Sequence, residues 1–98
     1  MNAPRNNPRP KFPLGQVVAT PGALEALREA KQEPLGLLRR HQRGDWGDLC
    51  AEDKAENEFS LEHDLRLLSA YILSTQVKIW VITEADRSVT TLLLPSEY

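Results

Sequence analysis

Two stretches near the carboxyl end of the chain limit most strongly what it can fold into. Residues 77–83 and residues 89–94 are rich in β-branched side chains, and a short charged segment, residues 84–88, separates them. Two such runs joined by a short polar segment predict a β-hairpin, which Pro95 closes. The connection contains no glycine, so we expect a loop of roughly four or five residues built on a type I turn.

The amino-terminal segment differs in character from the rest of the chain. Residues 1–13 contain four prolines and three basic side chains and almost nothing apolar. Such a segment cannot offset the entropy lost on ordering, so we expect a disordered, basic, proline-rich arm over residues 1–13. The chain has 98 residues with 41% hydrophobic content, which suits a single domain over residues 14–98.

Between the arm and the hairpin the pattern predicts a strand, three helices and a second strand. Thr20 and Pro21 are typical of a helix start, and Pro34 opens a second helix in the same manner. Gly44 is suited to end that helix, and Asp48 to cap a third. The first expected element is a strand over residues 16–19. Three helices are expected after it, over residues 21–31, from residue 34 to the stop at residue 44, and over residues 49–63. Residues 67–73 are expected to form a strand in preference to an extension of the third helix. The predicted class is α+β, in which an N-terminal short strand and three helices pack on a C-terminal three-stranded antiparallel meander.

Periodicity indicates which side chains face the core. The helical stripes are Leu24 with Leu27, Leu35 with Leu38, and Ala51 with Ala55 and Phe59. The third stripe is thin, so that helix is expected on the surface. In the hairpin, Trp80 and Ile82 point to the face opposite Ile79 and Val81, so both faces of the sheet should meet another group.

Three groups of residues are candidate contacts for a partner protein. In the turn Asp45, Trp46 and Asp48, the tryptophan can anchor a partner, or it can fill the core while the acids cap helices. Residues 45–64 hold eight acidic side chains against one lysine, a stripe that can imitate nucleic-acid phosphates or be simply solvated. The candidate contacts are completed by Glu52, Asp53, Glu56 and Glu58 of that stripe, and by Glu84, Asp86 and Arg87 of the hairpin loop.

The composition argues against several other functions. Residues 12–98 carry nine basic and fourteen acidic side chains, which argues against direct nucleic-acid binding. His41 and His63 are interpreted as solvent-facing helical residues, and Cys50 as a half-buried packing residue. No catalytic, cofactor or metal motif is present, so no cofactor, metal or catalytic residue is expected. A single cysteine and the lack of a leader or long apolar span predict a cytoplasmic protein with no membrane contact.

Several motifs resemble a family of small plasmid-related proteins carried on bacterial plasmids and integrative elements. The motifs lie at residues 12–16, 19–27, 44–48 and 77–88, and the resemblance covers nearly all of residues 12–98. It implies a mobile-element setting and brings no catalytic residue. Our leading hypothesis is therefore a non-enzymatic protein that binds and modulates a host defence or regulatory complex, as an anti-CRISPR or anti-restriction inhibitor does.

The order of the predicted elements is similar to that of the RelE/ParE toxin fold. That resemblance implies a ribonuclease or nucleic-acid binder that would use Tyr98 with the basic cluster Arg39, Arg40, His41 and Arg43. Two features depart from the toxin pattern, since the predicted sheet carries few basic residues and an extra acidic helix is present. A third hypothesis is a structural or dimerising partner in plasmid maintenance, held through an open sheet edge.

Overall fold

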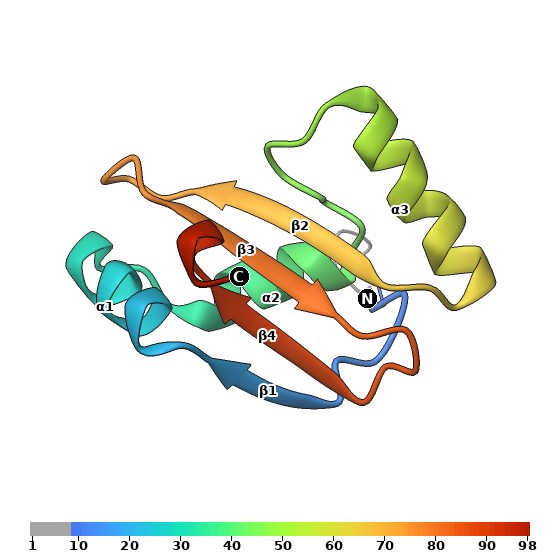
Figure 1. Cartoon of the computed structure of the whole chain (residues 1–98), viewed down its shortest axis with the longest axis horizontal. Helices are drawn as coiled ribbons and strands as arrows, with labels where there is room; N and C mark the ends of the chain where they lie inside the picture. The colour runs from blue at the N-terminus through green and yellow to red at the C-terminus, as the bar shows by residue number, and fades with distance from the viewer. Residues whose placement is uncertain (1–8) are drawn as a thin grey trace, which may run out of the picture.

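The computed structural model describes residues 9–98, so the prediction for residues 1–8 lies outside the described part of the chain. The elements, shown in Figure 1, are β1 (Gln16–Ala19), α1 (Pro21–Ala30), α2 (Pro34–Gln42), α3 (Ala51–His63), β2 (Leu67–Ile72), β3 (Lys78–Thr83), β4 (Val89–Leu93) and the 3₁₀ turn η1 (Pro95–Glu97). The α+β class is confirmed, and so is the strand assignment of residues 67–72. No helix within residues 9–98 is both long and apolar enough to span a membrane.

The sheet has four strands and is mixed, where a three-stranded antiparallel meander was expected. Its order is β1-β4-β3-β2, with β1 parallel to β4 and the other pairs antiparallel. The N-terminal strand therefore extends the sheet and does not pack on it. Gly15 allows this approach, because it has φ +67° and a Cβ at this position would lie 2.3 Å from the carbonyl oxygen of Ser88.

Helices α1 and α2 cover one face of the sheet and form the main core with it. Their buried side chains are Ala23, Ala26, Leu27, Leu37 and Leu38, which pack with Tyr71, Ile79, Val81 and Leu92 of the strands. Figure 1 shows α2 behind the sheet. Leu24 and Leu35, expected in the core stripes, are exposed. Small alanines occupy the inward positions of α1, which lets that helix approach the sheet closely.

The helix ends follow local chemistry, with one exception. The Thr20 hydroxyl accepts a hydrogen bond from the N–H of Ala23 at 3.1 Å, Pro21 and Pro34 open their helices, and Gly44 follows α2 with φ +83°, all as predicted. The prediction that Asp48 caps α3 is wrong, because the cap residue is Cys50. The Asp48 N–H bonds instead to the carbonyl of Ala70 at 2.6 Å, which ties the turn to β2.

Phe12 belongs to the packed structure, although the arm was expected to extend to residue 13. Its side chain is buried in a second, smaller core with Trp46 and Leu67. The Lys11 N–H bonds to the Gln42 carbonyl at 2.8 Å, and the Gln42 amide donates to the Phe12 carbonyl at 2.9 Å. The predicted boundary at residue 13 therefore lies too far along the chain, since one aromatic side chain with a backbone hydrogen bond anchors residues 11–12.

Candidate functional site

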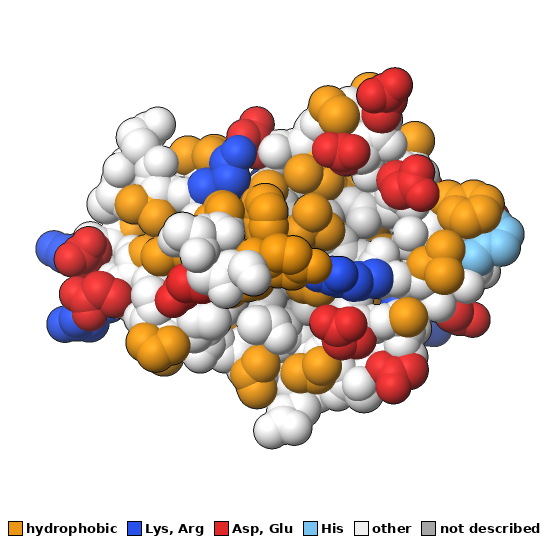
Figure 2. Space-filling view, in the orientation of Figure 1, with side chains coloured by type: hydrophobic (Ala, Val, Ile, Leu, Met, Phe, Trp, Pro, Cys, Tyr) orange, Lys and Arg blue, Asp and Glu red, His pale blue; other side chains and the backbone are white. Residues whose placement is uncertain are grey.

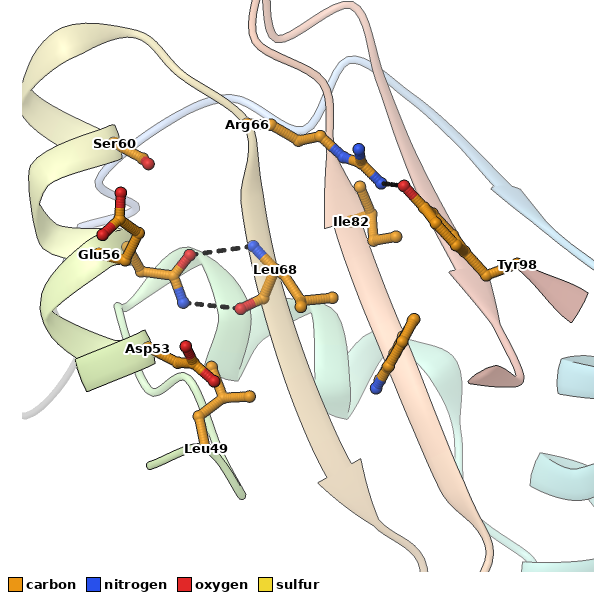
Figure 3. Close-up of a pocket in the computed structure, with 10 residues that line it drawn as sticks. Leu49, Asp53, Glu56, Ser60, Arg66, Leu68, Ile82 and Tyr98 are labelled. Atoms are coloured by element: carbon orange, nitrogen blue, oxygen red, sulfur yellow. Dashed lines mark hydrogen bonds between the residues drawn. The ribbon is translucent and has the colours of Figure 1, made fainter. Parts of the chain in front are cut away.

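A groove lies on the face of the sheet that α1 and α2 leave open. Its volume is about 360 Å³, and it is lined by Leu49, Asp53, Glu56, Asn57, Ser60, Arg66, Leu68, Trp80, Ile82 and Tyr98. Figure 2 shows hydrophobic side chains gathered at the centre of this face and acidic side chains over α3 beside it. In Figure 3, Asp53 and Glu56 of α3 lie on one side of the groove, and Arg66 and Tyr98 lie on the other.

The floor of the groove follows from the alternation of side chains along the strands. Because Ile79, Val81 and Thr83 point into the core, Trp80 and Ile82 point to the open face. The expectation that both faces of the hairpin carry apolar side chains is confirmed. On the open face the Trp80 indole is only partly covered, and it meets an aromatic side chain from the end of the chain.

Tyr98 forms the second wall and is held in place by two groups. Its ring packs edge-on against Trp80, with the centroids 5.7 Å apart, and its hydroxyl accepts a hydrogen bond from Arg66. Glu97 fixes the preceding turn, since its carboxylate accepts from the Thr20 hydroxyl, from the Gly22 N–H at 3.1 Å and from the Leu94 N–H at 2.8 Å. These bonds, led by that of Thr20, lower the pKa of the Glu97 carboxyl.

Helix α3 forms the first wall, and polar contacts hold it against the sheet. The Asn57 amide donates to the Leu68 carbonyl at 2.6 Å and accepts from the Leu68 N–H at 3.0 Å. Asn57 and Ser60 are the buried residues of the helix, whereas Phe59 is exposed. The predicted stripe of Ala51, Ala55 and Phe59 therefore faces solvent, contrary to expectation. The surface location of α3 is as predicted.

The acidic stripe reaches the groove at two positions. Asp53 and Glu56 line it, and Glu52 is exposed on the same helix. None of these three carboxylates takes part in an ion pair within residues 9–98. Glu58 has a different role, because it accepts a hydrogen bond from the indole N–H of Trp46 at 2.8 Å.

The turn that contains Trp46 is part of the packed structure. Trp46 is 3% exposed and stacks on Phe12, with the ring centroids 6.4 Å apart, so it is not available as a surface anchor. Asp45 accepts two hydrogen bonds from Arg40, at 2.7 and 3.3 Å, which lower the pKa of its carboxyl. Asp48 is exposed and lies 3.7 Å from the ammonium group of Lys78.

The hairpin loop contributes a structural tie in addition to a charged surface. The Arg87 guanidinium donates to the carbonyls of Leu65, at 2.6 Å, and Ser60, at 3.2 Å, so it binds the end of α3 to the loop. Asp86 is exposed and Glu84 is half-buried. Of the candidate contacts in this loop, Asp86 is the most accessible.

His41 is the largest departure from the sequence interpretation. It was expected to face solvent, yet its ring is completely buried, edge-on to Phe12 and Trp46. Its Nδ1 lies 2.5 Å from the Ser69 hydroxyl, and its Nε2 lies 2.9 Å from the Thr83 hydroxyl. Burial, with a smaller effect of Arg87, lowers the pKa of His41 to about 3.

The hydrogen bonds beyond His41 fix which ring nitrogen carries the proton. The Thr90 hydroxyl donates to the Leu14 carbonyl at 2.8 Å, so Thr83 must donate to Thr90, 2.7 Å away. The Thr83 oxygen then accepts from Nε2–H of His41, and Nδ1 accepts from Ser69. The chain of bonds is complete for a neutral imidazole, and it joins α2 to three strands.

The residues of the toxin hypothesis are not brought together. The basic cluster lies in the last turn of α2 and directly after it, and α2 packs on the core face of the sheet, whereas Tyr98 contacts Trp80 on the open face. Within that cluster His41 is buried and Arg40 is bonded to Asp45. His63 is exposed, as expected, and Cys50 is exposed, where half-burial was expected.

Sequence reasoning found only part of the groove. It named Asp53 and Glu56 as contacts and Tyr98 for the toxin hypothesis, but it gave Trp80 and Arg66 no part in a site. The available signal was the pair of apolar faces of the hairpin, which placed Trp80 opposite the core. No group of His, Cys, Asp and Glu within residues 9–98 is arranged to hold a metal ion. Comparison with protein-family models, with curated proteins and with solved structures gives no match for the chain.

Proposed function

We propose that this chain is a non-enzymatic binding protein that holds a segment of a partner protein in the groove between α3 and Tyr98. The observation that supports this most directly is the composition of the groove. Trp80, Ile82 and Leu68 supply an apolar floor, and Asp53 and Glu56 supply carboxylates without an ion-pair partner within residues 9–98. Aromatic floors with a few charged groups at the rim are typical of protein recognition sites.

The charges of the groove define the partner segment. An apolar side chain fits against Trp80, and a neighbouring lysine or arginine meets Asp53 and Glu56. Arg66 on the opposite wall donates to Tyr98 and has no carboxylate partner within residues 9–98, so it adds a place for an acidic group or a backbone carbonyl. The partner segment is therefore mainly apolar and basic, with one acidic group or backbone carbonyl opposite Arg66.

We take the cellular setting from the resemblance of the sequence to plasmid-related proteins. The partner is then a host defence or regulatory complex, such as a CRISPR or restriction complex, whose nucleic-acid-binding surface is basic. An acidic helix beside an apolar groove is suited to occupy such a surface and to block it.

A pull-down with matched charge reversals tests the proposal. Tagged protein is incubated with lysates that express CRISPR and restriction complexes, with and without nuclease, and bound proteins are identified by mass spectrometry. We expect a stoichiometric, nuclease-resistant partner that is lost in the triple variant Glu52→Lys, Asp53→Lys and Glu56→Lys. The control reverses three acids away from the groove, Glu25, Glu29 and Glu33, and should retain the partner.

Two outcomes would count against the proposal. Equal binding by both triple variants would show that the acidic stripe is not the contact. Ribosomal proteins and RNA that disappear after nuclease treatment would favour the toxin-like or nucleic-acid-binding hypothesis. The variant Tyr98→Ser tests the groove separately from the acidic stripe, because it removes one wall of the groove and changes no carboxylate of α3. Tyr98 is 69% exposed, so its truncation leaves the core intact.

A further inference from the structure

The two edges of the sheet are finished in different ways. At the β2 edge, the backbone groups of Leu68 that point away from β3 are bonded by the Asn57 side chain. Those of Ala70 are bonded by the backbone of Trp46, at 3.1 Å, and of Asp48, at 2.6 Å. Local segments therefore occupy this edge at Leu68 and Ala70, as is common where a protein protects a sheet from pairing with another chain.

Strand β1 forms the other edge, and its outer side is free within residues 9–98. The N–H of Gln16 bonds to Ser88 and that of Thr20 to Leu92, so alternate residues of the strand face β4. The N–H and C=O groups of Val17 and Ala19 point the other way. No hydrogen bond of the described residues uses these groups. Figure 1 shows β1 as the bare lower edge of the sheet.

This edge is apolar and carries no charge. Val17 and Val18 are 42% and 38% exposed, and residues 14–24 contain no charged side chain. Hydrophobic side chains mark the same edge in Figure 2. Symmetric pairing sets each edge against its own copy, so a charge there would meet a like charge. The rest of the folded chain is acidic, which leaves this neutral edge as a surface where two copies approach without repulsion.

We propose that β1 pairs in antiparallel fashion with β1 of a second copy, so that the two four-stranded sheets join across a twofold axis. With Val18 opposite the partner's Val18, Val17 exchanges backbone hydrogen bonds with the partner's Ala19. By symmetry Ala19 does the same with the partner's Val17. This register uses every free backbone group of both strands. The inference does not depend on the groove.

Sedimentation equilibrium of the full chain tests the pairing. The interface is small, so the dimer is weak, and the mass should rise from 11.1 kDa toward twice that value between about 10 μM and about 1 mM. Val18→Lys sets two ammonium groups face to face, and Val17→Pro removes an N–H, so both should remain monomeric. The control Leu35→Lys removes an exposed leucine of α2 and should still form the dimer.

Amide hydrogen exchange adds a readout at the proposed bonds. The amides of Val17 and Ala19 should become protected as concentration rises, while that of Leu68, already bonded to Asn57, should be protected throughout. A mass that stays at 11.1 kDa up to about 1 mM would overturn the inference. So would a dimer that persists in both edge variants, or one in which the two edge amides exchange freely. An extended segment of another protein on this edge would appear as protection without self-association, which also rejects the second copy.

Discussion

Replacement of His41 by glutamine should flatten the pH dependence of stability between pH 7 and pH 5. In the folded protein burial lowers the pKa of His41 to about 3, from its ordinary value of 6.5. Between these values the unfolded chain binds a proton that the folded chain does not. The free energy of unfolding therefore falls as the pH falls. Above pH 6.5 the neutral imidazole is present in both states, and the full stability is retained.

The size of the effect follows from the two pKa values. Each pH unit below 6.5 removes about 1.4 kcal/mol, so the native protein should lose about 2 kcal/mol between pH 7 and pH 5 through this residue. Carboxyl groups with ordinary pKa values of 3.8 and 4.5, such as Asp45 and Glu97, titrate mainly below this window. His41 therefore dominates the slope.

Urea unfolding at pH 7, 6 and 5 measures this slope. The amide introduced by His41→Gln keeps a donor for the Thr83 hydroxyl and cannot become charged, so this variant should be less stable at pH 7 but lose about 2 kcal/mol less on acidification. The exposed His63, replaced by glutamine, is the control. Parallel pH curves for native protein and His41→Gln would refute the argument. If that variant does not fold, His63→Gln leaves one histidine ring, whose NMR signals should not shift from pH 7 to pH 5.

Substitutions at three further positions test the contacts around α3 by urea or thermal unfolding. Gly47→Ala should lower the free energy of unfolding by at least about 2 kcal/mol, because Gly47 has φ +79° and a Cβ would lie 2.0 Å from the carbonyl oxygen of Ala70. An unchanged unfolding midpoint would contradict that geometry. Asn57→Ala should lower the free energy of unfolding by about 2–3 kcal/mol through the two buried bonds to Leu68. Asn57→Asp should not recover this loss, because a carboxylate oxygen would then face the Leu68 carbonyl oxygen. Arg87→Ala should lower the free energy of unfolding by about 1–2 kcal/mol and still capture the partner in the pull-down. If this variant is as stable as the native protein but no longer captures the partner, Arg87 contacts the partner directly.

Local chemistry made the helix ends and strands predictable. Thr20, Pro21 and Gly44 act through bonds and dihedral angles within a few residues, so their effect is visible in the sequence. The alternation in β3 likewise placed Trp80 on the face opposite Val81. These signals were sufficient for the fold class and for the side of the sheet on which Trp80 lies, but not for the groove itself.

The interior polar residues could not be predicted in the same way. His41 is a plausible surface residue at the end of a basic helix, and only the fold brings Ser69 and Thr83 to its ring and Thr90 to Thr83. These partners lie 28 and more residues away along the chain, so no local pattern reveals them. The parallel pairing of β1 with β4 is also a long-range contact, which is why the sheet was expected to have three strands.

Helix α3 shows how such long-range polar contacts also shape the candidate site. Its regular repeat of Ala51, Ala55 and Phe59 indicated an inward apolar face, but Asn57 takes that position because it can bond both backbone groups of Leu68. This contact therefore covers Leu68 at the β2 edge, beside the Trp46 and Asp48 backbone that covers Ala70, and it turns Asp53 and Glu56 toward the groove. If Asn57→Ala releases α3, the amides of the helix should exchange faster together with that of Leu68, which hydrogen exchange along α3 can detect.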